Sequence, residues 1–201
     1  MSKIKKWVPY VLLVVVSLIS LFPFYMMVTM STFKTENMFK TIPLYFSDYL
    51  INNLKTVLAS NFLKSYLNSL IVSCTATILC TLISAMSGYS LVAYNFKLKK
   101  FLQNLIMLTM MVPVQLGVVG YMIEMRTMHM TGTMFPMILI WLANGFGAYW
   151  MMQYIESSFP LELVESARVD GSGEIHTFFR IVLPCIKPGL LTLILLIFLW
   201  S

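Results

Sequence analysis

The residues of this chain whose types and spacing suit binding or chemistry are concentrated in one charged segment near residue 165. The segment reads Glu165-Ser166-Ala167-Arg168-Val169-Asp170-Gly171, and Ile181-Val182-Leu183-Pro184 follows nine residues later. Carboxylates, a guanidinium and a glycine at this spacing offer polar contacts at a surface. The pattern predicts two short helices joined by an Asp-Gly turn, which together form a docking element rather than a slack loop.

Local signals place the start and the end of the first of these helices. Pro160 suits a first turn, where its missing N–H would have no partner in any case. Glu162 and Glu165 lie early in the helix, where the helix dipole favours anions. Gly171 permits the left-handed backbone that often ends a helix. We expect Ser172 to cap a second helix, which contains Ile175, Phe178 and Phe179.

Other chemistry finds little support in the sequence. His129 and His176 have no Cys, His or acidic neighbour at metal-ligand spacing, so no metal site is predicted. No Gly is followed by Lys, so the chain has no Walker phosphate loop and any energy from ATP must come from a partner. No catalytic residue and no cofactor are predicted, and we expect a chain that is not an enzyme.

The composition places the chain in a membrane. It is 59% hydrophobic and 11% charged, against about 25% charged residues in a soluble domain. Residues 7–33, 65–96, 101–123 and 127–155 carry no Asp, Glu, Lys or Arg, and each run exceeds the roughly 20 residues that cross a bilayer. These runs predict four complete membrane helices. A fifth run, 189–201, is too short to span, so we expect the chain to end inside a membrane helix.

The distribution of Lys and Arg predicts the orientation. With the N-terminus inside, the inner segments hold nine of the 14 basic residues and the outer segments hold five. The net charge of +6 is therefore assigned to membrane topology, and no nucleic acid is expected as a partner. The predicted organisation is a cytoplasmic N-terminus with the first membrane helix (1–33), an extracytoplasmic segment (34–64) and a membrane core (65–201). Within the core, the charged segment at about 156–188 faces the cytoplasm.

Two of the predicted membrane helices have features beyond length. The helix at about 65–94 is rich in small residues, and the pair Ser84 and Gly88 at four-residue spacing predicts close contact with neighbouring helices. The helix at about 101–123 carries Pro113 with two glycines and is expected to be irregular, which lipid tolerates beside other helices or a watery cavity. Polar and aromatic residues suggest a translocation path without defining one, and no substrate residue is predicted: Asn68, Tyr89, Gln115, Tyr121, Asn144, Tyr149 and Trp150.

The charged segment resembles a known motif. Glu165-Ser166-Ala167, then Gly171 and Ile181-x-Leu183-Pro184, is similar to the EAA loop of bacterial ABC-importer permeases, with Ser166 where Ala is usual. The longer pattern from Pro160 to Gly171 resembles the carbohydrate-uptake branch, and so do the stretches Phe22-Pro23-Phe24 and Thr109-Met110-Met111-Val112-Pro113. The resemblance extends from about residue 20 to 201. It points to the smaller membrane subunit of maltose-, raffinose- or multiple-sugar-type importers.

This resemblance implies a fold, a role and partners. The expected fold is an all-α integral membrane protein, a polytopic helical bundle of the ABC-importer permease type, with four complete spans and an incomplete fifth where the full-length family has six. The expected location is a bacterial inner or plasma membrane, crossed several times. Implied partners are a sister permease subunit, two cytoplasmic ABC ATPase subunits, an extracytoplasmic sugar-binding protein and membrane lipid.

In that family the loop is a coupling helix that sits in a groove of the ATPase. Apolar residues would then supply an anchor, small residues would permit close approach, and charged residues would make rim contacts. The predicted ATPase-docking residues are Leu161, Glu162, Val164, Glu165, Ser166, Ala167, Arg168, Asp170, Gly171 and Phe178.

Two alternatives stay open at this point. The first is an ABC permease for another solute, such as glycerol-phosphate. The second is an ion-coupled secondary transporter, a class that usually places ionisable residues within its spans. The four complete predicted spans carry no Asp, Glu, Lys or Arg, which argues against the second alternative.

Overall fold

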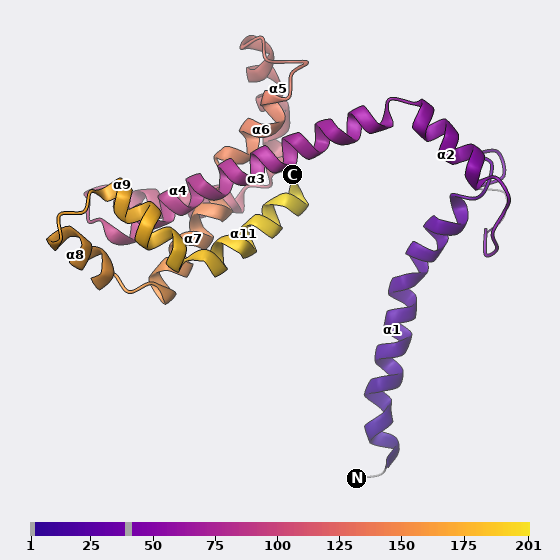
Figure 1. Ribbon diagram of the computed structural model, residues 1–201, viewed down its shortest axis with the longest axis horizontal. Coiled ribbons are helices and arrows are strands. Elements are labelled where there is room, and N and C mark those ends of the chain that lie inside the picture. The colour runs from indigo at the N-terminus through magenta and orange to yellow at the C-terminus, as the bar shows by residue number, and fades with distance from the viewer. Residues whose placement is uncertain (1–2, 39–41) are drawn as a thin grey trace. The chain divides into compact units, whose positions relative to one another are not determined.

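The computed structural model describes residues 3–38 and 42–201, and these residues form helices, turns and loops without a strand. The chain divides into two compact units, Met1–Tyr66 and Leu67–Ser201. Figure 1 labels most of the helices of both units. Lys40, which the sequence places in the outer segment, lies outside the described residues. The all-helical prediction is confirmed for the part that the structure describes.

The first unit contains α1 (Lys3–Met30), α2 (Leu50–Ala59) and the start of α3 (Phe62–Ala93). The connection between α1 and α2 is tied to the end of α1. The side-chain amide of Asn53 donates hydrogen bonds to the backbone carbonyls of Ser31 and Phe33, each at 2.8 Å. The Thr32 hydroxyl accepts from the backbone N–H of Ser47 at 2.8 Å. The predicted extracytoplasmic segment therefore has an ordered start.

The second unit contains the rest of α3 and a series of shorter helices. They are α4 (Lys99–Met111), α5 (Val114–Thr127), α6 (Phe135–Leu142), α7 (Gly145–Ser158), α8 (Glu162–Val169), α9 (Glu174–Thr177), the π-helix η1 (Phe178–Val182), α10 (Leu183–Cys185) and α11 (Lys187–Trp200). One apolar core joins α3, α7, α8, η1 and α11. Its largest side chains with no exposed surface are Met151, Ile155, Val182, Ile186, Leu193 and Ile197.

Helices α3 and α7 approach each other closely at a glycine. A Cβ atom on Gly88 would lie 2.7 Å from the backbone carbonyl carbon of Met151 and 2.7 Å from the backbone nitrogen of Met152. Ser84 is also buried on this face of α3. The predicted helix contact through Ser84 and Gly88 is confirmed, because only a residue without a side chain lets the two backbones come this near.

Three helical segments are long and apolar enough to cross a membrane as single spans: Trp7–Met30, Phe62–Ala93 and Phe135–Ser158. Two further helix pairs qualify only as bent spans. Lys99–Met111 and Val114–Thr127 meet at 99°, and Glu174–Cys185 and Lys187–Trp200 meet at 81°. The chain therefore has three to five candidate spans. The predicted count of four complete spans and a partial fifth is not confirmed.

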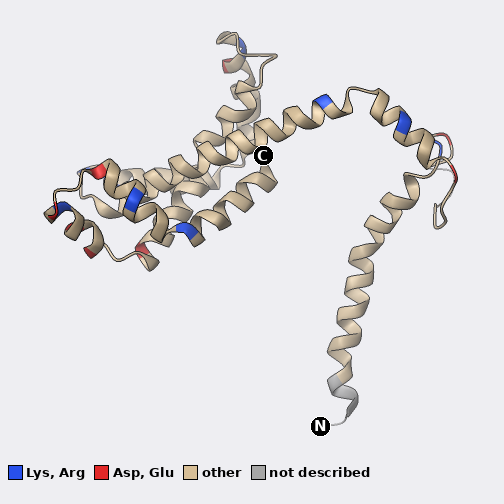
Figure 2. Cartoon of the chain, viewed as in Figure 1, with Lys and Arg blue, Asp and Glu red and all other residues tan. Residues whose placement is uncertain are grey.

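The expected irregularity of the helix at 101–123 is a sharp break. Proline lacks the N–H that would continue the helix, and its ring clashes with the carbonyl four residues earlier. The residue before it is pushed toward extended backbone, and Val112 has φ −88° and ψ 120°. The charged residues of the second unit gather around α8 and α9 and at the end of α5, with uncharged helix between (Figure 2).

Candidate functional site

The charged segment forms a folded elbow, which we define as residues 160–185. Helix α8 starts after Pro160, whose carbonyl accepts from the Leu163 N–H at 3.3 Å. Glu162 and Glu165 lie in the first turn, as the sequence predicts. Their negative charge is favourable there because the first N–H groups of a helix carry partial positive charge.

The Asp-Gly turn is a Schellman motif. The Ser172 N–H donates to the carbonyl of Ala167 at 2.9 Å, and the Gly171 N–H donates to the carbonyl of Arg168 at 3.0 Å. These bonds satisfy two of the carbonyls that a helix end leaves open. Gly171 has φ +79°, a left-handed conformation that strains other L-residues. The predicted helix stop at Asp170-Gly171 is confirmed, and the turn has one well-defined geometry.

The expected cap on the second helix is wrong. Gly173 is the N-cap residue of α9 and makes no side-chain cap hydrogen bond. Ser172 is already held by the turn, and its hydroxyl accepts from the Thr177 hydroxyl at 3.0 Å instead. The helix therefore begins one residue later than a Ser172 cap would set it. It then widens into η1, and π-turns of this kind occur often at functional sites.

A three-residue cluster, which we call the clasp, joins both arms of the elbow to the end of α3. Arg168 Nε lies 2.8 Å from Glu174 Oε1, and Arg168 Nη2 donates to Glu174 Oε2 at 3.3 Å. The Tyr94 hydroxyl donates to Glu174 Oε2, and the Arg168 guanidinium lies over the Tyr94 ring, 5.2 Å from its centroid. Hydrogen bonds from Arg168 and then Tyr94 lower the pKa of the Glu174 carboxyl. The Glu174 carboxylate in turn raises the pKa of Arg168.

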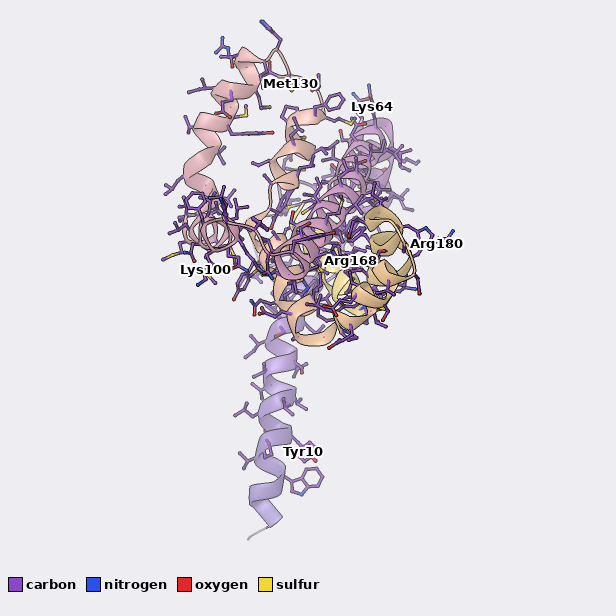
Figure 3. All side chains as sticks on the ribbon, turned by 90° about the vertical axis from the view of Figure 1, so that its left-hand side faces the viewer. Tyr10, Lys64, Lys100, Met130, Arg168 and Arg180 are labelled. Carbon is purple, nitrogen blue, oxygen red and sulfur yellow. The ribbon has the colours of Figure 1, made fainter. Side chains whose placement is uncertain are left out.

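The ten predicted docking residues divide between two faces of the elbow. Val164, Ala167 and Phe178 are buried within this chain, and Leu161 is half-buried against the same core. The polar members and the turn glycine are exposed: Glu162, Glu165, Ser166, Arg168, Asp170 and Gly171. Figure 3 labels Arg168 and Arg180 in the elbow, with Arg180 projecting outward and Met130 at the other end of the unit. The docking role of the ten residues remains a prediction. The buried ones, Val164, Ala167 and Phe178, are placed to hold the elbow on the bundle.

Three exposed apolar residues of the elbow lie outside the predicted docking set. Val169 is 87% exposed, Ile175 is 78% exposed and Phe179 is 45% exposed. Helical spacing from Val164 and Ala167, which face the chain's own core, places Val169 on the opposite side of α8. That spacing was the signal in the sequence that could have identified Val169 as an exposed residue. Glu174 was also missed, although it carries the charge opposite to Arg168 across the turn.

A hollow of about 370 Å³ lies at the base of α8. Its lining combines polar groups from α4, α7 and α8 with apolar residues from the end of α3: Leu91, Val92, Lys99, Gln103, Glu156, Phe159, Pro160, Leu161 and Glu162. Two predicted docking residues thus line a concave surface. Within residues 3–38 and 42–201, no group of three or more His, Cys, Asp and Glu is placed to hold a metal ion.

Comparisons with known proteins define the class of this chain. Residues 78–201 match the family described as the binding-protein-dependent transport system inner membrane component. The match covers more than half of the chain, so the chain belongs to this family of ABC importer permeases.

Individual relatives are named for several solutes. The arabinooligosaccharides transport system permease protein AraQ of Bacillus subtilis is 31% identical over 68% of this chain and 48% of its own length. The sn-glycerol-3-phosphate transport system permease protein UgpE of Pectobacterium atrosepticum is 27% identical over 96% of this chain and 71% of its own. The chain spans about half the length of the first curated relatives that it matches.

The fold has a solved counterpart. It superposes with a TM-score of 0.84 on a chain in the crystal structure of a bacterial ABC transporter involved in the import of the acidic polysaccharide alginate. The superposition covers 99% of this chain and 72% of the other, at 22% sequence identity. The likeness establishes the ABC permease fold. The secondary-transporter alternative has no further support.

Proposed function

We propose that this chain is the membrane-spanning permease subunit of an ATP-driven sugar importer, in which the elbow couples the translocation path to a cytoplasmic ATPase. The observation that carries the proposal is the outer face of the elbow. Acidic Glu162 and Glu165 flank the exposed apolar residue Val169 on one rigid helix, and Ile175 adds a second exposed apolar residue beyond the turn. Apolar anchors with a polar rim are typical of protein interfaces.

The inner face of the elbow explains how movement would reach the path. Val164 and Phe178 are buried with Tyr89 of α3 and Ile155 of α7. The rings of Phe178 and Tyr89 lie 5.6 Å apart, centroid to centroid. Because a close-packed core does not deform continuously, a displaced elbow would move α3 and α7 with it. The clasp adds a polar link from the same elbow to the end of α3.

The proposal includes partners and an arrangement in the membrane. The partners are a sister permease subunit that forms the other half of the path, two cytoplasmic ATPase subunits, and an extracytoplasmic sugar-binding protein. ATP hydrolysis belongs to the ATPase subunits. The proposed topology has residues 1–33 as a cytoplasmic N-terminus with the first membrane helix, 34–64 outside, and 65–201 as the permease core with the loop at about 156–188 inside. The gathering of charge around α8 and α9 supports a watery environment for the elbow (Figure 2).

Charge reversal on the outer face tests the docking role. Glu165 is exposed and has no side-chain partner in the part of the chain that the structure describes, so Glu165→Lys changes the surface without disturbing the core. The full-length protein would be expressed with its partner subunits, and retention of the ATPase through purification would be measured beside ATP-dependent uptake. We expect the variant to insert normally and to lose both ATPase retention and uptake.

Glu124→Lys is the matched control, because Glu124 is also an exposed acid and lies in α5, away from the elbow. It should retain the ATPase. A Glu165→Lys protein that keeps both its ATPase and its uptake would show that the elbow is only a connection between two helices.

A second candidate solute is glycerol-phosphate. Its support is the similarity to UgpE, which extends over more of this chain than the similarity to AraQ. Uptake assays with a neutral oligosaccharide and with sn-glycerol 3-phosphate would separate the two candidates.

A further inference from the structure

A cavity of about 590 Å³ lies where two helical segments of the second unit are interrupted. One interruption is Val112-Pro113, between α4 and α5, and the other is Ala143-Asn144, between α6 and α7. The cavity is lined by residues of both interruptions and of α11: Thr109, Met110, Val112, Val114, Gln115, Ile140, Trp141, Ala143, Asn144, Gly145, Phe146 and Trp200. Its volume falls within the range of roughly 300–1,000 Å³ that is usual for ligand pockets.

The interruptions leave backbone groups without helical partners at this place. A helix leaves its last carbonyls and its first N–H groups open. Pro113 cannot donate to the carbonyl of Thr109, which a continuous helix would require. Lipid offers such groups no partner, so non-helical backbone at membrane depth is tolerated where protein or water satisfies it. Two interruptions that face one cavity therefore indicate a cavity that holds polar matter.

Side chains add further free hydrogen-bonding capacity. Asn144 Oδ1 accepts from the Gly147 N–H at 2.8 Å, which caps α7 and leaves the amide hydrogens of Asn144 available. The Gln115 amide has no hydrogen-bond partner among the residues that the structure describes. Gln115 is exposed, so its amide is open to water or to a bound solute.

Aromatic rings form the apolar part of the lining. Trp141 and Phe146 come from the two sides of the second interruption, and Trp200 comes from α11. The Phe146 and Trp200 rings meet edge to face, with their centroids 5.2 Å apart. Flat aromatic faces beside amide groups suit a ligand with an apolar ring face and several hydroxyl groups.

The lining contains no Asp, Glu, Lys, Arg or His. An anion transferred here from water would have no opposite charge to offset its desolvation, which is costly for an ion and much less so for a hydrogen-bonded hydroxyl group. We propose that this cavity is a solute-binding site on the translocation path and that it accepts an uncharged carbohydrate in preference to a phosphate ester. The inference rests on the proposed function and assigns the substrate class from the lining alone.

Chemical labelling of a single cysteine tests the proposal. The three native cysteines would be replaced by Cys74→Ser, Cys80→Ala and Cys185→Ser in the full-length protein, assembled with its partner subunits. Gln115→Cys would then be treated with a membrane-impermeant trimethylammonium methanethiosulfonate reagent. The probes are maltose, arabinotriose, diacetylchitobiose and sn-glycerol 3-phosphate. Leu116→Cys is the matched control, because Leu116 is the next residue of α5, is 73% exposed and does not line the cavity.

We expect the Gln115→Cys thiol to react. The Leu116→Cys thiol should stay unreactive, because in the proposed topology lipid covers this side of α5 and excludes the charged reagent. At saturation, at least one of the neutral sugars should slow the Gln115→Cys reaction by at least about fivefold, because only the unoccupied fraction reacts. Protection by glycerol phosphate alone, protection by none of the four probes, or an unreactive Gln115→Cys thiol would each overturn the proposal. None of these results bears on ATPase retention in Glu165→Lys, so the site and the docking role fail separately.

Discussion

The elbow and the cavity use polar groups in opposite ways. In the elbow, the charges of Arg168 and Glu174 satisfy each other, and the Schellman bonds to Ala167 and Arg168 close the end of α8. In the cavity, Asn144 caps α7 through its Oδ1 and keeps its amide hydrogens, and Gln115 has no partner within the described residues. Self-satisfied polar groups make a stiff element with a fixed outer surface, whereas unsatisfied ones leave capacity for a bound solute. The proposed lever and the proposed binding site thus differ in where their hydrogen bonds go.

The two regions share the packing of α3 against α7, so the largest effect is expected from breaking that contact. In Gly88→Ala the new Cβ would lie 2.7 Å from backbone atoms of Met151 and Met152, and neither backbone can move aside freely. Overpacking of this kind costs about 3 kcal/mol. We expect a lower thermal unfolding midpoint for the detergent-solubilised protein, with loss of both ATPase retention and uptake. Gly120→Ala is the control, since its Cβ would meet no atom within 4 Å; equal midpoints would contradict the close approach.

A smaller effect, confined to the elbow, is expected from its turn. Gly171→Ala forces a side chain into a backbone with φ +79°, at a cost of about 1 kcal/mol. Hydrogen exchange of the amides in α8 and α9 should quicken, while labelling at the cavity stays unchanged. Gly173→Ala serves as the control, because Gly173 has φ −70° and an open Cβ position. The same exchange rates in both variants would mean that the turn does not stiffen the elbow.

The cavity should respond differently at its two amides. Asn144→Ala removes the cap of α7 and should destabilise the protein by about 1 kcal/mol. Gln115→Ala removes no contact of the fold and should change stability by less than about 0.5 kcal/mol while uptake falls. Thermal unfolding and uptake, measured on both variants, separate support from binding. A Gln115→Ala protein with full uptake would remove Gln115 from the proposed site.

The smallest effect is expected at the clasp, because both side chains of its ion pair are more than a third exposed and water screens them. Arg168→Glu and Glu174→Arg should each reduce uptake, and the double swap should restore part of it. Because the folded pKa of Glu174 is lowered, the clasp is complete above the ordinary carboxyl pKa of about 4.3 and is lost as pH falls through the lower folded value. Uptake at neutral pH is therefore the suitable measurement. If uptake does not recover in the double variant, the ion pair of the clasp does not contribute to transport.

Much of the elbow could be predicted because its signals are local. Pro160, the early acids and the Asp-Gly pair each act on their own turn of helix, and the structure has a helix and a stop where these residues place them. Ser172 suited either the turn or the N-cap of α9. Its backbone N–H closes the turn and its hydroxyl accepts from Thr177, so the prediction of a Ser172 cap was wrong. The sequence predicted an irregular helix at Pro113 but not the size of its bend, which is 99°. The size of a bend depends on what packs against both arms.

The sequence alone predicted the membrane class, the helices, the turn and the family resemblance, because hydropathy, charge and turn chemistry act over a few neighbouring positions. The tertiary structure decided which side of the elbow faces outward. Val164 and Phe178 are apolar enough for an interface or for a core, and only their packing against α3 and α7 shows that they belong to the core. It also brought two distant helix breaks around one cavity. Contacts between residues far apart in the chain depend on the whole fold, and no local pattern encodes them.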